Sequence, residues 1–214
     1  RLFLPVFSMI LVMLINVVYD IATGSAPLSF FMISIKNGVL YGRLIDILNR
    51  GSEIAILAIG MTLVVSASGG TDISVGSVTA LVCMVLADLM ENKGVNTYVA
   101  VLVALLIGVA FGVVQGFLVA YLDIQPFIVT LAGMFFGRGM TAIISTDMIS
   151  IKNETFLAWA NAKIYLPFIG SYSKSGKFHP AYIYPTVIIA LIIVAIIAVV
   201  MKYTKFGREV YAGG

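Results

Sequence analysis

The sequence predicts an all-α protein, a polytopic membrane bundle of about six transmembrane helices. Two observations lead to this prediction: 61% of the 214 residues are hydrophobic and 11% are charged, and the apolar residues lie in long runs. Soluble domains carry about 25% charged residues, so this chain has too few to cover a surface that faces water. The composition excludes a soluble domain, a disordered chain, a collagen-like chain and a disulfide scaffold.

Six apolar runs are candidates for membrane spans. A helix that crosses the hydrocarbon core needs about 20 mostly apolar residues. The candidates are residues 2–19, 53–68, 75–90, 97–122, 126–144 and 181–203. The second and third runs are short and only residues 69–74 separate them, so we expect a helix broken within the membrane near Gly69-Gly70. A turn outside the membrane is the alternative. Backbone that leaves the helix at membrane depth must be buried in protein or line a cavity.

Two long connections join these runs, residues 20–52 and 145–180. Within the first, one helical face is apolar, and this pattern favours a short helix lying in the membrane interface. Its apolar residues are Leu40, Leu44, Ile47 and Leu48. The second connection holds Trp159, which we interpret as an anchor at the interface rather than a platform for a sugar.

Small residues recur every four positions along the run 97–122. They are Ala100, Ala104, Gly108, Gly112, Gly116 and Ala120. Small side chains let helix backbones approach closely, which is a main source of helix association in lipid. The stripe therefore predicts helix packing through Gly108, Gly112 and Gly116. Gln115 lies in the same run and either faces a cavity or bonds to a neighbouring helix.

The segment 68–77, SGGTDISVGS, is the richest in polar groups. Its glycines can end one helix, and Thr71, Asp72 or Ser74 can cap the next. Asp72 is favoured there because the helix macrodipole attracts an acidic group to the N-terminus. A broken helix can also line a transport path with its hydroxyls and free amides. The two interpretations of Asp72 are compatible.

Arg138 is the one cation deep within a predicted span. An arginine at a helix centre costs roughly 2.5–3.5 kcal/mol on insertion scales. It follows Pro126 by about 18 Å of helix, so it either reaches the far interface or pairs inside the bundle. The candidate residues of a substrate path are therefore Thr71, Asp72, Ser74, Gln115 and Arg138.

Patterns of catalysis and of metal binding are missing from the sequence. There is no HExxH, no GxSxG and no paired-cysteine site, and the single cysteine has no partner. The net charge is +3 without a basic block, so nothing indicates nucleic-acid binding. We expect a protein with no catalytic residues, no metal and no cofactor.

The segments on both sides of the broken helix resemble the signature of ribose-type sugar permeases, the membrane subunits of bacterial ATP-binding-cassette (ABC) importers. They read LAIGMTLVV at 57–65 and GGTDISVGS at 69–77, where the family usually has GGIDLSVGS. The next family block matches QPFIVTLAGM at 125–134 and GRG at 137–139. Residues 38–42 and 45–50 look more like the galactofuranose-type branch.

The resemblance implies the permease fold of an ABC importer in truncated form. Residues 1–214 would be a single transmembrane domain, about the N-terminal two-thirds of a permease in the bacterial inner membrane. The implied partners are a second permease subunit (identical or different), ATPase subunits, a periplasmic sugar-binding protein and the bilayer. The implied cargo is a monosaccharide such as galactofuranose or ribose, with ATP hydrolysis left to the partner.

The end of the chain, FGREVYAGG at 206–214, is similar to the family's entry into the cytoplasmic coupling loop. The resemblance implies that residues 204–214 begin this loop and that Phe206, Gly207, Arg208 and Tyr211 couple to the ATPase. It also makes the connections 20–52 and 145–180 extracytoplasmic. The positive-inside rule alone favours the opposite orientation, because eight basic residues lie on the side of those connections and four on the side of the termini.

An ion-coupled secondary transporter of a small polar solute is the alternative. Such a protein needs carboxylates within the membrane for proton or sodium coupling. Asp72 and Asp88 are the only candidates, and Asp88 lies near the end of a predicted span.

Overall fold

The computed structural model describes residues 3–24, 34–36, 39–41, 43–172 and 178–213. These residues form two compact units, and each unit is described by itself. The first comprises Arg1–Ala55 and Lys163–Leu191, and the second comprises Ile56–Ala162 and Ile192–Gly214. Gly38, Gly42 and Gly214, which belong to the family motifs at 38–42 and 206–214, lie outside the described residues.

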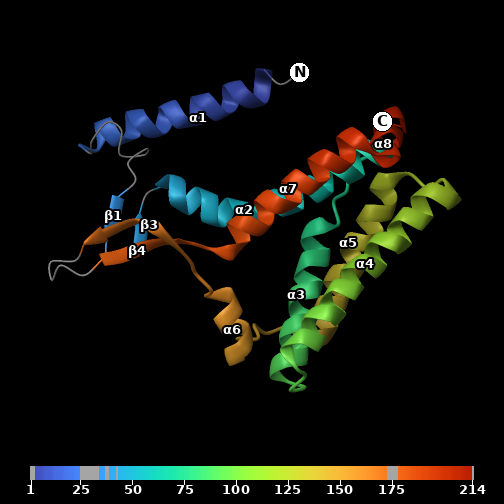
Figure 1. Ribbon diagram of the computed structural model, residues 1–214. Helices are drawn as coiled ribbons and strands as arrows, with labels where there is room; N and C mark the ends of the chain where they lie inside the picture. Colours follow the sequence, from blue (N-terminus) through green and yellow to red (C-terminus); the bar gives the residue numbers. More distant parts are fainter. Residues whose placement is uncertain (1–2, 25–33, 37–38, 42, 173–177, 214) are drawn as a thin grey trace. The chain divides into compact units, whose positions relative to one another are not determined.

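Helices make up most of the described chain (Figure 1). They are α1 Phe3–Ala22, α2 Arg43–Ser68, α3 Val75–Glu91, α4 Thr97–Leu122, α5 Pro126–Ile144, α6 Glu154–Ala160, α7 Pro185–Tyr203 and α8 Lys205–Gly213. Five of the six predicted spans are helical over their described residues. The start of the sixth was wrong, because residues 181–183 end a strand and the helix begins at Pro185, a residue that suits the first position of a helix. Among the described residues, four helices rather than the six predicted are long and apolar enough to cross a membrane, namely Ile47–Ser68 within α2 and the whole of α4, α5 and α7. Helix α3, with 17 residues, and the apolar part of α1, Val6–Ala22, are shorter. The prediction of a polytopic helical membrane protein is confirmed.

The helix predicted over residues 40–50 is not a separate element. Leu40 lies in a strand, and the residues from Arg43 onward form one continuous helix, α2, with the span that ends at Ser68. The segment contains no proline, and the lone Gly51 does not interrupt the helical hydrogen bonds. The hydroxyl of Ser52 instead donates to the carbonyl of Asn49 within the helix, at 2.7 Å. The expected boundary between an interfacial helix and span two was therefore wrong.

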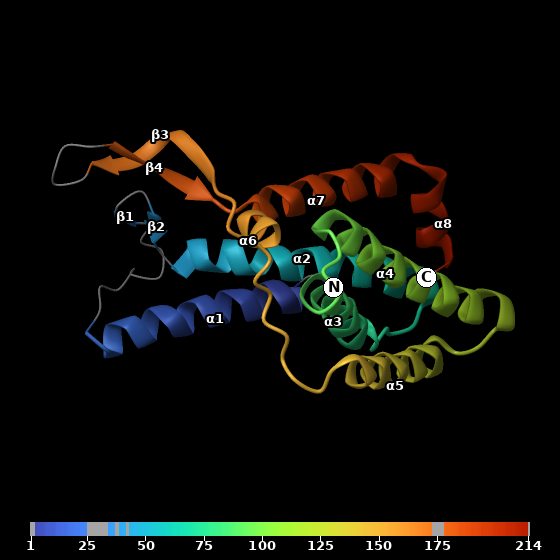
Figure 2. The same cartoon turned by 90° about the horizontal axis from the view of Figure 1, so that it is seen from below.

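Two antiparallel hairpins lie in the long connections between the predicted spans, and they also include Leu40, which was expected in a helix, and residues 181–183, which were expected in the sixth span. Strands β1 (Ser34–Lys36) and β2 (Val39–Tyr41) pair with Ile35 opposite Leu40. Strands β3 (Ile164–Tyr172) and β4 (Phe178–Ile183) pair with Tyr165 opposite Tyr182 (Figure 2). The two hairpins contact each other, β1 with β3 and β2 with β4. Aromatic and β-branched residues, which favour strands, are frequent in β3 and β4.

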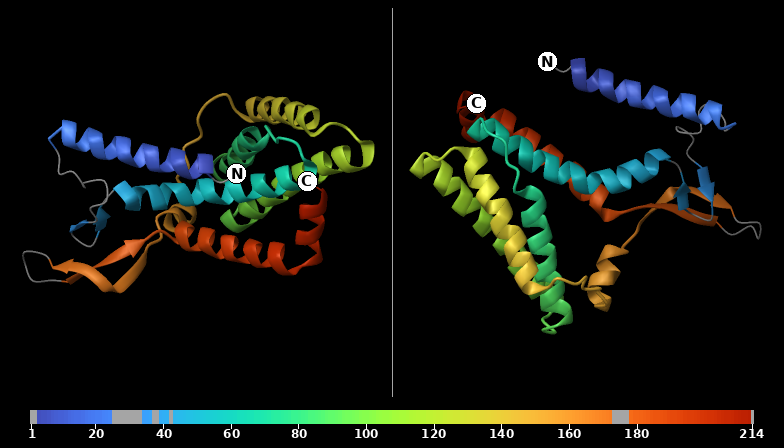
Figure 3. Two further views of the ribbon diagram at one scale, coloured as in Figure 1. Left: turned by 90° about the horizontal axis from the view of Figure 1, so that it is seen from above. Right: turned by 180° about the vertical axis from the view of Figure 1, so that it is seen from behind.

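The second unit has its core where α3 packs against α4 and α5, which lie side by side with it in Figures 1 and 3. The α4 side of this core uses the start of the small-residue stripe, because Ala100 and Ala104 are 0% and 4% exposed. On the α5 side, a Cβ atom placed on Gly137 would lie 3.2 Å from the Ser77 hydroxyl. The absence of a side chain at Gly137 therefore permits the close approach of α3 and α5.

Polar side chains tie α6 to the adjoining ends of α3 and α4. The carboxylate of Glu91 accepts the backbone N–H groups of Lys152 and Asn153 at 2.7 and 2.9 Å. Asn153 in turn accepts the hydroxyl of Thr97 at 2.9 Å and caps α6. The rings of Trp159 and Tyr98 meet edge-on, with centroids 4.8 Å apart. The position of Trp159 at this end of the helices is typical of an interface anchor.

The chain turns sharply between α7 and α8 (Figure 3). The hydroxyl of Thr204, the residue between the two helices, donates to the carbonyl of Val200 at 2.7 Å. Gly207 is buried, and a Cβ atom on it would overlap the backbone of Met201. Gly207 is therefore the residue that lets α8 fold back onto the end of α7.

Candidate functional site

The helical run is interrupted between α2 and α3 near Gly69-Gly70, where a broken helix was predicted. The position of this break within the membrane stays a prediction. Gly69 has a φ of 62°, a left-handed conformation that ends α2 and that glycine adopts without strain. Residues 71–74 are irregular, and α3 begins at Val75 with Ser74 at its N-cap position. A Cβ atom on Gly70 would lie 2.6 Å from Cβ of Pro126, the first residue of α5. The break is thus pressed closely against the start of α5.

Asp72, Ser74 and Gln115 form a hydrogen-bonded chain at the break. Atom Oδ1 of Asp72 accepts both the backbone N–H and the hydroxyl of Ser74, each at 2.7 Å. The Ser74 hydroxyl, on a residue only 1% exposed, accepts in turn from Nε2 of Gln115 in α4 at 3.1 Å. Asp72 thereby holds Ser74, the N-cap residue of α3, while no side chain of the described residues accepts from the first N–H groups inside that helix. Gln115 bonds to a neighbouring element, which is one of its two expected roles.

Two residues of α5 complete this cluster. A Cβ atom on Gly133 would overlap the side-chain amide of Gln115, so the missing side chain leaves the space in which that amide lies. The hydroxyl of Thr130, a buried residue, lies 3.3 Å from the carbonyl of Thr71 and 3.2 Å from that of Phe127. Thr130 can therefore satisfy a carbonyl that the irregular backbone leaves without a helical partner.

A groove of about 480 Å³ opens beside this cluster. Its polar lining comes from Ser68, Asp72, Gln115 and Thr130, and its apolar lining includes Val64, Pro126 and Val119. Gly112, Gly116 and Ala120 form the α4 side of the groove. A second cavity, of about 390 Å³, lies between α4 and α5 with Gln115 on its edge and almost wholly apolar walls. The irregular backbone at the break thus lies next to a cavity, an arrangement that is compatible with the predicted position within the membrane.

The predicted packing residues of α4 have different surroundings. A Cβ atom on Gly108 would lie 3.9 Å from Val82 of α3, an ordinary packing distance. Gly112 and Gly116 face the groove, and Cβ atoms added to them would meet none of the described residues within 4 Å. Helix packing at these two glycines stays a prediction.

The remaining predicted residues lie apart from the cluster. Arg138 is exposed on α5 and makes no ion pair with the described residues. In α8, Phe206 is 51% exposed and Arg208 is exposed, whereas Gly207 is buried. Tyr211 belongs to the last turns of the same helix. The coupling role of these α8 residues stays a prediction.

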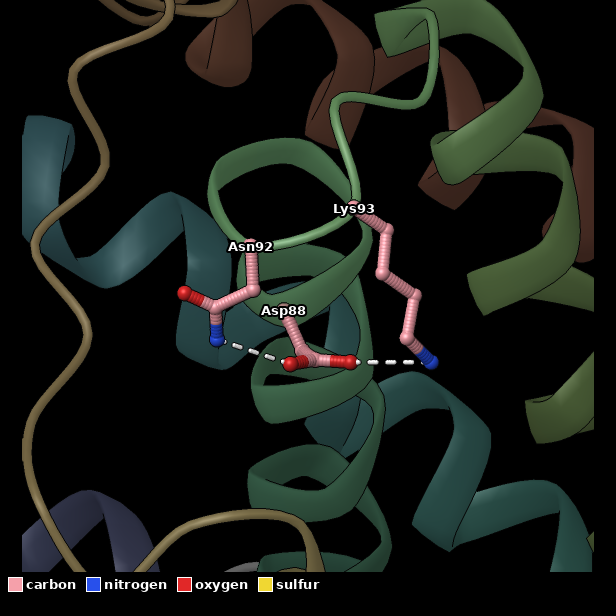
Figure 4. A network of polar contacts seen from close by, with 3 residues as sticks. All are labelled: Asp88, Asn92 and Lys93. Carbon is pink, nitrogen blue, oxygen red and sulfur yellow. Dashed lines mark hydrogen bonds and ion pairs between the residues drawn. The ribbon is translucent and has the colours of Figure 1, made fainter.

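Asp88 does not belong to the cluster either. Its carboxylate accepts from the Asn92 amide at 2.8 Å and pairs with the Lys93 ammonium at 3.2 Å, at the end of α3 (Figure 4). No group of three or more metal-binding side chains occurs in the described part of the chain. Of the two carboxylates considered for ion coupling, Asp72 alone lines the groove.

Thr130, Ser77 and Pro126 contribute to the site, although the sequence analysis did not single them out. For Thr130 the sequence does contain a signal, because Thr130, Gly133 and Gly137 of α5 follow each other at intervals of three and four residues. This spacing places small residues on one helical face. The structure shows that this face is turned toward α3 and Gln115.

We expect Ser74→Ala to lower the free energy of unfolding by about 1–3 kcal/mol, because it removes two hydrogen bonds and leaves the Gln115 amide without its partner. Thermal unfolding of the purified protein in detergent measures the change. Thr79→Ala is the matched control, since the exposed Thr79 hydroxyl bonds only to its own helix. Equal unfolding temperatures for the two variants would contradict the role given to Ser74.

The apolar helices of the described residues define the class of a multi-pass helical membrane protein, with a polar groove beside the break between α2 and α3. The chain belongs to the family described as branched-chain amino acid transport system / permease component, which matches residues 43–214. Together with the four apolar helices among the described residues, this match identifies a multi-pass protein of the inner membrane in a family of permease components rather than of enzymes. The resemblance to sugar permeases of ABC importers is confirmed by the relatives described next.

Three of the curated relatives that are similar to the chain are named as sugar permeases. The chain is 39% identical to the galactofuranose transporter permease of Escherichia coli over 140 residues, which are 64% of this chain and 40% of the relative. It is 34% identical to the ribose import permease of Escherichia coli over 171 residues, 80% of this chain and 49% of the relative. It is 30% identical to a fructose import permease of Bifidobacterium longum over 200 residues, 91% of this chain and 57% of the relative.

The chain spans about half the length of the curated relatives it matches. No solved structure matches it.

Proposed function

We propose that this chain is part of the permease subunit of an ABC importer that moves a monosaccharide across the bacterial inner membrane. The observation that carries the proposal is the match of residues 43–214 to a permease family whose similar curated members import sugars. Galactofuranose, ribose and fructose, the sugars named for these relatives, are the first candidates for the cargo.

The groove supports a path for a polar solute. Its carboxylate, amide and hydroxyl groups supply hydrogen-bond partners, while its other walls are apolar. We place Thr71, Asp72, Ser74 and Gln115 along this path, at the point where the helix is broken. Arg138 lies on the exposed side of α5 and would meet the solute only at another part of the path.

The proposed partners are ATPase subunits, a periplasmic sugar-binding protein and a second permease subunit. Helix α8 supports the contact with the ATPase, because Phe206 and Arg208 are exposed on a short helix that follows the last described span. In this proposal ATP binding closes the ATPase pair, and α8 passes the movement to the membrane helices. The connections 20–52 and 145–180, with their hairpins, would face the binding protein outside the membrane.

We expect Asp72→Asn to fold normally and to lower transport about tenfold or more if Asp72 lines the path. The asparagine oxygen can still accept both bonds from Ser74, so the loss of stability is about 1 kcal/mol or less. Uptake of labelled sugar and thermal unfolding, measured on the same preparation, separate the two effects. Unchanged uptake would leave Asp72 with no role beyond holding Ser74.

Reconstitution tests the proposed function. The whole permease, its ATPase and its binding protein are placed in proteoliposomes, and labelled galactofuranose, ribose and fructose are supplied in turn. We expect at least one sugar to accumulate, and only when the binding protein is present. Accumulation of none of these or related monosaccharides by an active preparation would contradict the proposal.

A further inference from the structure

The groove beside the broken helix is lined by a negative charge and by no positive one in the described part of the chain. Among the described residues that line it, Asp72 is the only ionisable one, and neither lysine nor arginine is among them. Most of the remaining lining is apolar or glycine. A carboxylate flanked by such walls is screened less by water than one at an open surface, so its field inside the groove is strong.

The carboxylate is held with one oxygen used and one oxygen open. Atom Oδ1 of Asp72 receives both bonds from Ser74, whereas Oδ2 makes no hydrogen bond with the described residues. Gln115 supports this arrangement through its bond to the buried Ser74 hydroxyl. The amide of Gln115 is itself held over Gly133, where a side chain would displace it. Asp72, which lines the groove, therefore holds its carboxylate in a fixed position and keeps one oxygen, Oδ2, free to accept a further hydrogen bond.

We propose that Asp72 is the charge-selecting residue of this groove, which accepts hydroxyl donors from the sugar and rejects anionic solutes such as sugar phosphates. The inference rests on the proposed function and goes beyond it, because it assigns the exclusion of anions to one residue. A hydroxyl group donates to a carboxylate in a short, strong bond. A phosphate brought near the same carboxylate meets like-charge repulsion and finds no cation among the lining residues.

Thiol labelling in the groove tests this selection without a transport measurement. Cys83, the only cysteine, is exposed and is first replaced, giving Cys83→Ser. Gly116→Cys then places a single thiol in the groove, and Ala120→Cys is a second version in case the first does not fold. Ala110→Cys is the matched control, because Ala110 lies on the same helix but lines the apolar cavity, which holds no carboxylate.

The full-length permease is labelled in membranes with a cationic and an anionic methanethiosulfonate reagent of similar size. Each labelling rate is divided by the rate at which the same reagent reacts with a free thiol. For Gly116→Cys we expect the cationic reagent to be favoured about tenfold. Adding Asp72→Asn should bring the ratio close to that of Ala110→Cys. An equal ratio at both positions, or a preference that survives Asp72→Asn, would overturn the proposal.

Protection by solutes provides the second measurement. Ribose and galactose should slow the labelling of Gly116→Cys, whereas ribose 5-phosphate at the same concentration should not. Protection by the phosphate equal to that by the sugars would overturn the selection against anions. Sugar uptake by the reconstituted importer is measured separately, so failure of the proposed function would be seen as absent uptake and failure of this inference as absent charge selection.

Discussion

Gly137→Leu is expected to abolish the folded bundle of α3, α4 and α5. A Cβ atom at this position would lie 3.2 Å from the Ser77 hydroxyl and 3.3 Å from the Ser77 carbonyl oxygen, and leucine adds three further carbon atoms beyond it. Overpacking of a filled core costs typically about 1–3 kcal/mol and occasionally more. The cost falls on the contact between α3 and α5, and the backbone at Ser77 cannot move without displacing the break that precedes α3.

Gly139→Leu is the matched control for this substitution. Gly139 lies two residues further along the same helix, is exposed, and has none of the described residues within 4 Å of a Cβ atom placed on it. Both variants add the same side chain to α5, so their helix propensities change alike. We expect the Gly137 variant to be lost to aggregation or degradation and the Gly139 variant to elute as a single peak in detergent. Equal yields and equal unfolding temperatures would contradict the close approach at Ser77.

Gly207→Ala is expected to uncouple the membrane helices from the ATPase. The added methyl group would overlap the backbone of Met201, which cannot rotate away as a side chain could. To relieve the overlap, α8 must leave its position on α7, at a cost on the order of 1–3 kcal/mol. Because the contacts of α3 with α4 and α5 involve other residues, the bundle itself should stay folded.

Two measurements on the reconstituted importer check this prediction. Stimulation of ATP hydrolysis by the sugar-loaded binding protein should fall about tenfold or more, while the unfolding temperature of the permease changes little. Glu209→Ala, on an exposed position of the same helix, should keep the stimulation near its original level. Full stimulation in the Gly207 variant would show that the fold of α8 onto α7 is not needed for coupling.

The membrane helices could be predicted from the sequence because long apolar runs have few alternatives in a bilayer. The break near Gly69 was predictable for a related reason, since two short runs on either side of a glycine pair cannot form one straight helix. The continuity of the helix past residue 50 was not predictable, because an amphipathic segment followed by an apolar run is compatible with two helices or with one. The continuous hydrogen bonds of α2 show that Gly51 does not end the first segment.

The hairpins and the polar cluster illustrate two other limits of sequence analysis. Strands β3 and β4 pair in a register that changes between Leu166 and Gly170, and this register follows from the fold and not from a local pattern in the sequence. Asp72, Ser74 and Gln115 were all candidates for the substrate path. Because 41 residues separate Ser74 from Gln115, there was no sign in the sequence that these two side chains bond to each other. Thr130 was missed because a threonine in an apolar helix commonly bonds to its own backbone.

The energy source of uptake tests the central claim most directly. The accumulated sugar is offered to proteoliposomes that contain either ATP, a non-hydrolysable ATP analogue, or no nucleotide together with a proton or sodium gradient. An importer permease of the proposed kind accumulates sugar with ATP alone and not with the analogue or with either gradient. Accumulation driven by a gradient in the absence of ATP would contradict the account and favour an ion-coupled transporter.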